Sequence, residues 1–252
     1  MISRTSPRLL GRVIALLFLL TIITGVFAQG FVSDRLYVSN DAAATATNFL
    51  TQRGLYELGF TVFIIEMASN IATTALWYVL LRPVNRSIAL SAAFLDLSGG
   101  IIKTFARVFF IAPLFVLGNS AAVFPGFTTQ QLQSISLILF KVNNQGAALA
   151  MAFFGFSVLL NGYLIFRSMF LPRWLGVLAL ISGLCWLTFI YPPFGRSIFV
   201  YTAIFGLLSS VAMIVRLLIG VNEERWKEAA ARPHEMVDWT TTQLRQRAPA
   251  RP

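Results

Sequence analysis

Residues 88–117 read IALSAAFLDLSGGIIKTFARVFFIAPLFVL and carry three charged side chains, Asp96, Lys103 and Arg107, in an otherwise apolar stretch. An apolar helix of about 20 residues spans the ~30 Å hydrocarbon layer of a membrane and satisfies its own backbone hydrogen bonds. We therefore expect this stretch to form a transmembrane helix. A charge within hydrocarbon costs at least a few kcal/mol and is rarely kept without a partner, so these three side chains point to a polar site.

The rest of the chain indicates the same class of protein. It is 57% hydrophobic and 12% charged over 252 residues, far from the composition of a soluble domain. Together with 88–117, apolar runs of spanning length lie at residues 9–28, 56–81, 142–166, 175–191 and 198–219. We expect an all-α, polytopic membrane bundle of six transmembrane helices at residues 1–220. Residues 221–252 are expected to form a polar cytoplasmic tail that starts as a helix and becomes disordered from Arg232 onward.

The basic residues predict the orientation of the bundle. Alternate connections between the apolar runs contain most of them, and cytoplasmic loops are the ones enriched in Lys and Arg, so both termini are expected inside the cell. The predicted location is the plasma or inner membrane. The net charge of +10 is then a topology signal spread over short loops, and we expect no nucleic-acid partner. The basic side has Arg4, Arg8, Arg12, Arg82, Arg86, Arg167, Arg173 and Arg216, and the other side has Arg35, Arg53, Lys141 and Arg196.

The first apolar run has two interpretations. The basic residues 1–12, the apolar residues 13–24 and the small residue Ala28 before Gln29 resemble a cleavable signal peptide. The run reaches spanning length when Ala28 is included, which favours a retained first helix. Both interpretations leave the other five helices in the same orientation.

Two helix starts are predicted outside the spans. Asp41 is an N-cap for a short helix at residues 42–53, and Thr128 with Gln131 forms a capping box. The helix at residues 130–141 either lies on the membrane surface or extends the fourth span.

The polar residues of the 88–117 segment share one face. Asp96, Gly100, Lys103 and Arg107 are spaced four, three and four residues apart, which places them in one narrow stripe of a helix. The stripe must face other helices or water, because lipid leaves the charges unsatisfied. Gly99 and Gly100 allow a neighbouring helix to approach closely.

Helix depth predicts the partners of this stripe. The 56–81 and 88–117 segments run in opposite directions, so a rise of ~1.5 Å per residue brings Glu66 level with Lys103 and Asn70 one turn further in. Asp96 lies deeper and has no basic partner at its own level. Arg107 is near the external boundary and is expected to snorkel toward it.

The leading hypothesis is an externally open polar pocket between the second, third and fourth spans. It would bind or move a small polar molecule or a lipid head group, in a chain that is a possible homo-oligomer. The candidate residues are Glu66, Asn70, Asp96, Lys103, Arg107, Asn143, Asn144 and Gln145. Two alternatives stay open: a structural or accessory subunit whose ion pairs order the helices, and an intramembrane lipid-modifying enzyme acting through Glu66 or Asp96.

The residue inventory argues against most catalytic and metal chemistry. His234, in the tail, is the one histidine, and Cys185 is the one cysteine. An intramembrane Ser–His pair and a His-ligated haem or zinc site are therefore not expected. We assign no catalytic residue, metal or cofactor.

Several short stretches resemble a known family. The most specific is Leu-Leu-Arg-Pro-Val-Asn-Arg at residues 80–86, joined by residues 41–46, 154–155, 162–165 and 171–173. The chain is identified on these residues as a member of the uncharacterised prokaryotic membrane-protein family called domain of unknown function 4386. This resemblance extends over about residues 8–220 and implies a multi-span membrane protein. It implies no activity and no functional residues.

Overall fold

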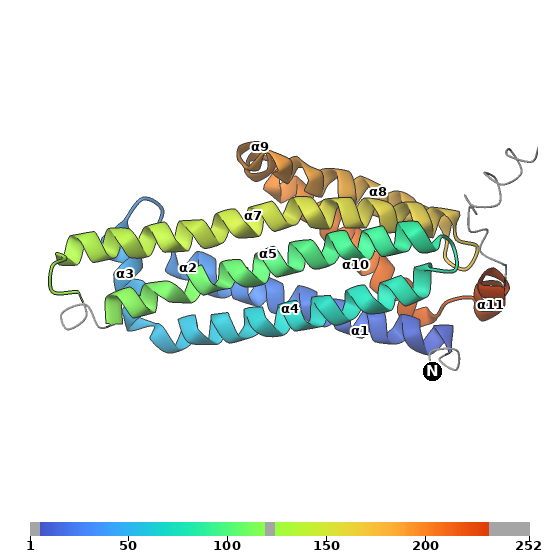
Figure 1. Cartoon of the computed structure of the whole chain (residues 1–252), viewed down its shortest axis with the longest axis horizontal. Helices are drawn as coiled ribbons and strands as arrows, with labels where there is room; N and C mark the ends of the chain where they lie inside the picture. The colour runs from blue at the N-terminus through green and yellow to red at the C-terminus, as the bar shows by residue number, and fades with distance from the viewer. Residues whose placement is uncertain (1–5, 119–123, 232–252) are drawn as a thin grey trace, which may run out of the picture.

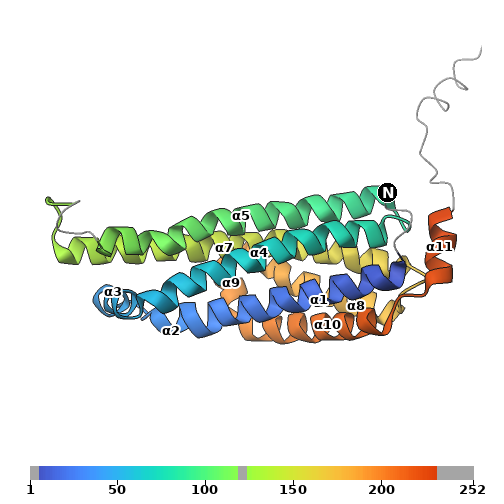
Figure 2. The ribbon, with the colours of Figure 1, turned by 90° about the horizontal axis from the view of Figure 1, so that it is seen from below.

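The computed structural model describes residues 6–118 and 124–231, and the regular structure within those ranges is helical. The long helices run side by side in an elongated bundle (Figures 1 and 2). Six helical segments of the described residues are long and apolar enough to cross a membrane, so the predicted all-α fold class is confirmed. The predicted disorder after Arg232 lies outside the described residues.

The first crossing segment is α1 (Pro7–Val26), which continues through a π-helical turn η2 (Phe27–Ser33) into α2 (Asp34–Leu36). The other elements follow in chain order: α3 (Ala42–Thr51), α4 (Arg53–Leu81), α5 (Arg86–Gly118), α7 (Thr129–Arg167), α8 (Arg173–Leu187), η3 (Thr188–Ile190), α9 (Pro192–Ser197), α10 (Phe199–Ile219) and α11 (Glu223–Ala231).

Both predicted helix starts are present. Asp41 Oδ1 accepts a hydrogen bond from the Ala44 backbone N–H at 2.8 Å, and Thr128 and Gln131 form the reciprocal capping box. One boundary needs correction: the short helix α3 ends at Thr51 and not at Arg53, which begins α4. The capped helix at 129 continues without a break into the fourth span, so of its two predicted placements the extension is confirmed, and α7 is 39 residues long.

The two ends of the bundle differ in charge. One end, which we call the Arg-rich end, contains the start of α1, the end of α4, the start of α5 and the α7–α8 connection. It also holds the end of α10 (Figure 1). The other end contains α3 and is called the α3 end. The arginines in the described residues of the Arg-rich end include Arg8, Arg12, Arg82, Arg86, Arg167, Arg173 and Arg216.

Helix length divides the molecule into two parts. The hairpin of α8, η3 and α10 is built from segments of 18 and 21 residues, about 27 and 32 Å long. In contrast, α4, α5 and α7 have 29, 33 and 39 residues, or about 44, 50 and 58 Å. These three helices therefore extend past the hairpin toward α3, as both views show (Figures 1 and 2).

The extended part has a core of its own. Phe49 of α3 and Tyr56 of α4 are buried with ring centroids 4.4 Å apart, and Tyr56 stacks at the same distance on Phe110 of α5. Phe140 of α7 completes this aromatic cluster. A second apolar core lies nearer the Arg-rich end, where residues of α1, α4, α7, α8 and α10 pack together.

Small residues set the distance between neighbouring helices. A Cβ added to Gly162 of α7 would lie 2.9 Å from the Leu180 backbone nitrogen, and one added to Gly176 of α8 would lie 2.5 Å from the Phe166 nitrogen. Glycine therefore lets the backbones of α7 and α8 touch, as is typical of packed membrane helices. The approach expected at Gly99 is also present, against the Phe154 ring of α7.

Candidate functional site: the polar seam between α4 and α5

The polar faces of α4 and α5 meet along a regular antiparallel contact that we call the polar seam. Four pairs form it: Thr74 with Asp96, Asn70 with Gly100, Glu66 with Lys103, and Phe63 with Arg107. Successive pairs are three or four residues apart on each helix, so the seam follows one face of both helices. Asn70 Oδ1 lies 3.6 Å from a Cβ built at Gly100, which is an ordinary contact distance, so Asn70 packs against this position of α5.

The predicted partnership of Glu66 and Lys103 is confirmed. Lys103 Nζ lies 2.5 Å from Glu66 Oε1, and Lys103 and Glu66 are 7% and 5% exposed. A Cβ added to Gly25 of α1 would lie 2.9 Å from the same Glu66 oxygen, so α1 passes directly over the pair. Three helices therefore enclose this ion pair.

Arg107 is 1% exposed, so the prediction that it snorkels to the boundary is wrong. Its Nη1 donates to Asn143 Oδ1 of α7 at 2.9 Å, and its Cζ lies 3.4 Å from the Phe63 ring centroid. The reason is the length of α7. This helix begins at Thr129 and covers the half of α5 nearer the α3 end, so a residue expected at the boundary is buried under Asn143.

We refer to Glu66, Lys103, Arg107 and Asn143 as the charged cluster. One negative and two positive side chains leave it a net formal charge of one positive. Two buried atoms of the cluster have no hydrogen-bond partner among the described residues, Glu66 Oε2 and Arg107 Nε. The cluster is packed and mostly paired, which is the geometry of a structural ion-pair network.

The two other candidate residues on α7, Asn144 and Gln145, lie at the margin of this cluster. Asn144 Oδ1 accepts from Asn143 Nδ2 at 3.0 Å. Gln145 is exposed and its Oε1 accepts from Arg196 of α9, away from α4. Gln145 thus joins α7 to the turn between α8 and α10.

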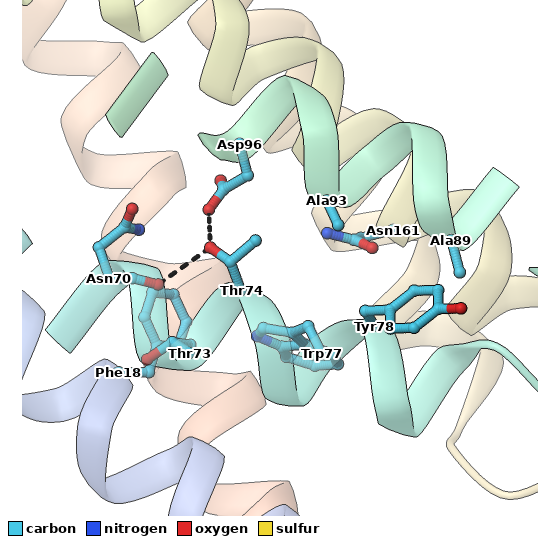
Figure 3. Close-up of a pocket in the computed structure, with 10 residues that line it drawn as sticks. All are labelled: Phe18, Asn70, Thr73, Thr74, Trp77, Tyr78, Ala89, Ala93, Asp96 and Asn161. Carbon is cyan, nitrogen blue, oxygen red and sulfur yellow. Dashed lines mark hydrogen bonds between the residues drawn. The ribbon is translucent and has the colours of Figure 1, made fainter. Parts of the chain in front are cut away.

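A cavity of about 50 Å³ lies in the half of the bundle nearer the Arg-rich end, and Figure 3 draws the residues that line it. We call it the Asp96 cavity. Its lining includes Asn70 and Asp96 and none of the other six candidate residues, so the structure splits the candidate set into two groups. The lining residues are Phe18, Asn70, Thr73, Thr74, Trp77, Tyr78, Ala89, Ala93, Asp96 and Asn161.

Asp96 lies at the end of the seam nearer the Arg-rich end, beside a polar side chain of α4. Thr74 Oγ1 of α4 lies within hydrogen-bonding distance of Asp96 Oδ2 and also of the Asn70 carbonyl oxygen (Figure 3). Asn70 of α4 and Asn161 of α7 line the same cavity. Within the described residues, no Lys or Arg nitrogen lies within 4.0 Å of this carboxylate.

Thr74, Ser157 and Asn161 were not among the residues predicted from the sequence. Thr74 lies four residues after Asn70 and eight after Glu66, so it continues the polar face of α4. This spacing is the sequence signal from which Thr74 could have been predicted. Asn161 Nδ2 donates to Ser157 Oγ at 3.4 Å, one turn apart on α7.

The site has little capacity for a metal of high charge. Among the described residues there is no group of three or more His, Cys, Asp or Glu side chains placed to hold a metal ion. Asp96 is the one carboxylate in the lining of its cavity.

The fold and the seam define a multi-pass α-helical membrane protein with charged groups in its interior. The family model described as a domain of unknown function (DUF4386) matches residues 13–223, and the chain belongs to this family. No curated protein and no solved structure matches the chain. The family description names no activity, so function must be argued from the site.

Proposed function

We propose that this protein binds a small polar solute in the Asp96 cavity, between α4, α5 and α7. The supporting observation is a carboxylate inside the membrane bundle that faces a cavity and has no basic partner among the described residues. Intramembrane carboxylates are costly, and those without a partner typically belong to ligand or ion pathways.

The proposed access route is from the Arg-rich end. The lining reaches Tyr78 and Ala89, near the last turn of α4 and the first turn of α5. By the positive-inside rule this end is cytoplasmic, in a plasma or inner membrane. The proposal therefore places the opening on the cytoplasmic side, whereas the sequence pattern favours the external side.

The charged cluster supports a second role, that of a structural clamp. Glu66, Lys103 and Arg107 join α4, α5 and α7, and buried pairs of this kind fix helix register more than they add stability. If the Asp96 cavity takes up no solute, this clamp alone describes a membrane scaffold or accessory subunit.

Cysteine labelling tests the cavity and its side. Cys185 is the only cysteine, so Cys185→Ser provides a background without thiols. Ala93→Cys lines the cavity, whereas Leu90→Cys, on the same helix, is exposed toward the surrounding lipid. The thiolate is the reactive form and requires water, so silver ion, a thiol-reactive monovalent cation small enough for the cavity, should modify Ala93→Cys about tenfold faster or more than Leu90→Cys.

Two exposed positions identify the side of the membrane from which the reagent acts. Ser87→Cys reports the Arg-rich end and Thr47→Cys the α3 end. The proposal expects Ala93→Cys to react with reagent added on the side that labels Ser87→Cys. Reaction only from the Thr47 side would overturn the access route. Labelling no faster than that of Leu90→Cys would leave the scaffold role.

A further inference from the structure

We infer that the solute of the Asp96 cavity is a monovalent cation, either a proton or a sodium-sized ion, with Asp96 as its charged ligand. This inference rests on the proposed function and narrows the class of solute. The size of the cavity, its charge and the neutral hydrogen bond to Asp96 each support it.

The size of the cavity excludes most organic solutes. Pockets for drug-sized ligands measure ~300–1,000 Å³, whereas this cavity measures about 50 Å³. One water molecule needs about 10–15 Å³ on this kind of measure. The cavity therefore has room for a few water molecules, or for one small ion with part of its hydration shell.

The negative charge of the cavity favours a monovalent cation as its solute. Asp96 contributes one negative charge, and the nearest basic residue along the same face of α5, Lys103, is already paired with Glu66 two turns away. A monovalent cation balances Asp96 in the low dielectric of the bundle. A divalent ion takes six or more oxygen ligands, usually with several carboxylates, which the lining does not offer.

The other lining groups suit such an ion. Asn70, Thr74 and Asn161 line the cavity with amide and hydroxyl groups, and oxygen ligands are those that hard cations prefer. The remaining titratable group facing the cavity is the Tyr78 phenol of α4. From the neighbouring helices α1 and α7, Phe18 and Asn161 face the cavity, and neither ionises.

The hydrogen bond from Thr74 leaves the charge of Asp96 uncompensated. Thr74 Oγ1 donates to Asp96 Oδ2 and also lies within hydrogen-bonding distance of the Asn70 carbonyl oxygen. A hydroxyl donor is neutral, so it solvates the carboxylate and leaves its negative charge for a cation to balance.

Charge movement in reconstituted membranes tests the inference. Protein in liposomes on a solid-supported membrane receives a step to lower pH at constant sodium, and separately a step in sodium at constant pH. A proton site responds to the first step and a sodium site to the second, because ion entry to Asp96 displaces charge across part of the membrane. Either response supports the inference and identifies the ion.

Variants assign the response to the cavity. Asp96→Asn should abolish the charge movement, whereas Asp34→Asn, an exposed carboxylate in α2, should leave it unchanged. Thr74→Val should reduce the apparent affinity about tenfold, while its control Thr61→Val, which also bonds to the carbonyl four residues earlier, should not. Ala93→Leu fills the cavity and should block the response, unlike Ala72→Leu on the lipid-facing side of α4.

The results separate the two proposals. Charge movement that persists in Asp96→Asn overturns the cation inference. So does the absence of any response from wild-type protein whose Ala93→Cys variant labels rapidly, which would leave a neutral polar solute. If Ala93→Cys fails to label, the proposed binding function itself fails.

Discussion

The charged cluster and the Asp96 cavity lie on the same seam between α4 and α5, yet they treat a buried carboxylate in opposite ways. Glu66 touches Lys103 and is enclosed by α1, whereas Asp96 has hydroxyl and amide neighbours and faces an open volume. The first arrangement neutralises the charge within the protein. The second leaves Asp96 without a basic partner among the described residues, and on our proposal a bound cation supplies the neutralising charge.

Breaking the ion pair from one side should have the largest effect. Lys103→Met leaves the Glu66 carboxylate buried without a cation and is expected to destabilise the protein by about 3–5 kcal/mol. The double variant Glu66→Gln with Lys103→Met removes both charges and should recover most of this loss. Thermal unfolding of purified protein in detergent measures both effects. A single variant as stable as the wild type would mean that the pair does not clamp the helices.

The Arg107 contact provides the next test of the cluster. Asn143→Ala removes the acceptor of Arg107 Nη1 and leaves a buried charged donor unpaired, at an expected cost of about 1–3 kcal/mol. The adjacent control Asn144→Ala, whose side chain is only partly buried, should cost less than half as much. Equal losses at the two positions would show that Arg107 does not depend on Asn143.

At the Asp96 cavity, removing the charge should keep or raise the stability of the protein, the opposite of the loss expected for Lys103→Met. In buffer of low sodium content and near-neutral pH, Asp96→Asn removes an unpaired charge and keeps a polar group beside Thr74. We expect unchanged stability or a gain of about 1 kcal/mol, measured by the same unfolding assay. A loss as large as that of Lys103→Met would place Asp96 among the clamp residues and remove the contrast.

A partly exposed carboxylate should show the smallest effect of substitution on stability. Hydrogen bonding from Ser6, with the nearby Arg8 and Lys227, lowers the pKa of Glu223 in α11 below its ordinary value of 4.5. A lowered folded-state pKa adds stability above pH 4.5 that is lost as the pH falls through the folded-state value. Glu223→Gln should therefore unfold slightly earlier than wild type at neutral pH, and the two melting curves should converge in acid. A difference that grows in acid would contradict this assignment.

The sequence predicted the parts of the seam that depend on helix periodicity. Opposite chain directions and a constant rise per residue bring Glu66 level with Lys103, and the same arithmetic relates Asn70 to Gly100. Hydropathy predicted the six spans because each must be apolar over the thickness of the membrane. Both inferences use local regularities that one chain displays directly.

The burial of Arg107 and the position of the cavity depend on packing between distant segments. The cover over Arg107 cannot be inferred from α5 alone, because it comes from Asn143 on another helix. The cavity is bounded by Phe18 of α1, Trp77 of α4 and Asn161 of α7, whose side chains meet only in the folded bundle. Helical spacing predicts which face a residue shares, but a void depends on which side chains fail to fill the space between faces.

The length of the short α8–α10 hairpin also indicates what fraction of the membrane voltage acts at Asp96. Its length of about 27–32 Å matches the hydrocarbon layer, and Asp96 lies about 15 Å along α5 from Arg86 at the Arg-rich end. A monovalent ion that reaches Asp96 from that end therefore crosses about half of the membrane field. Crossing the whole field is worth ~2.3 kcal/mol per charge for each 100 mV, so half of that energy changes the binding constant of the ion about sevenfold. The resting voltage of a cell would therefore act directly on ion binding at Asp96.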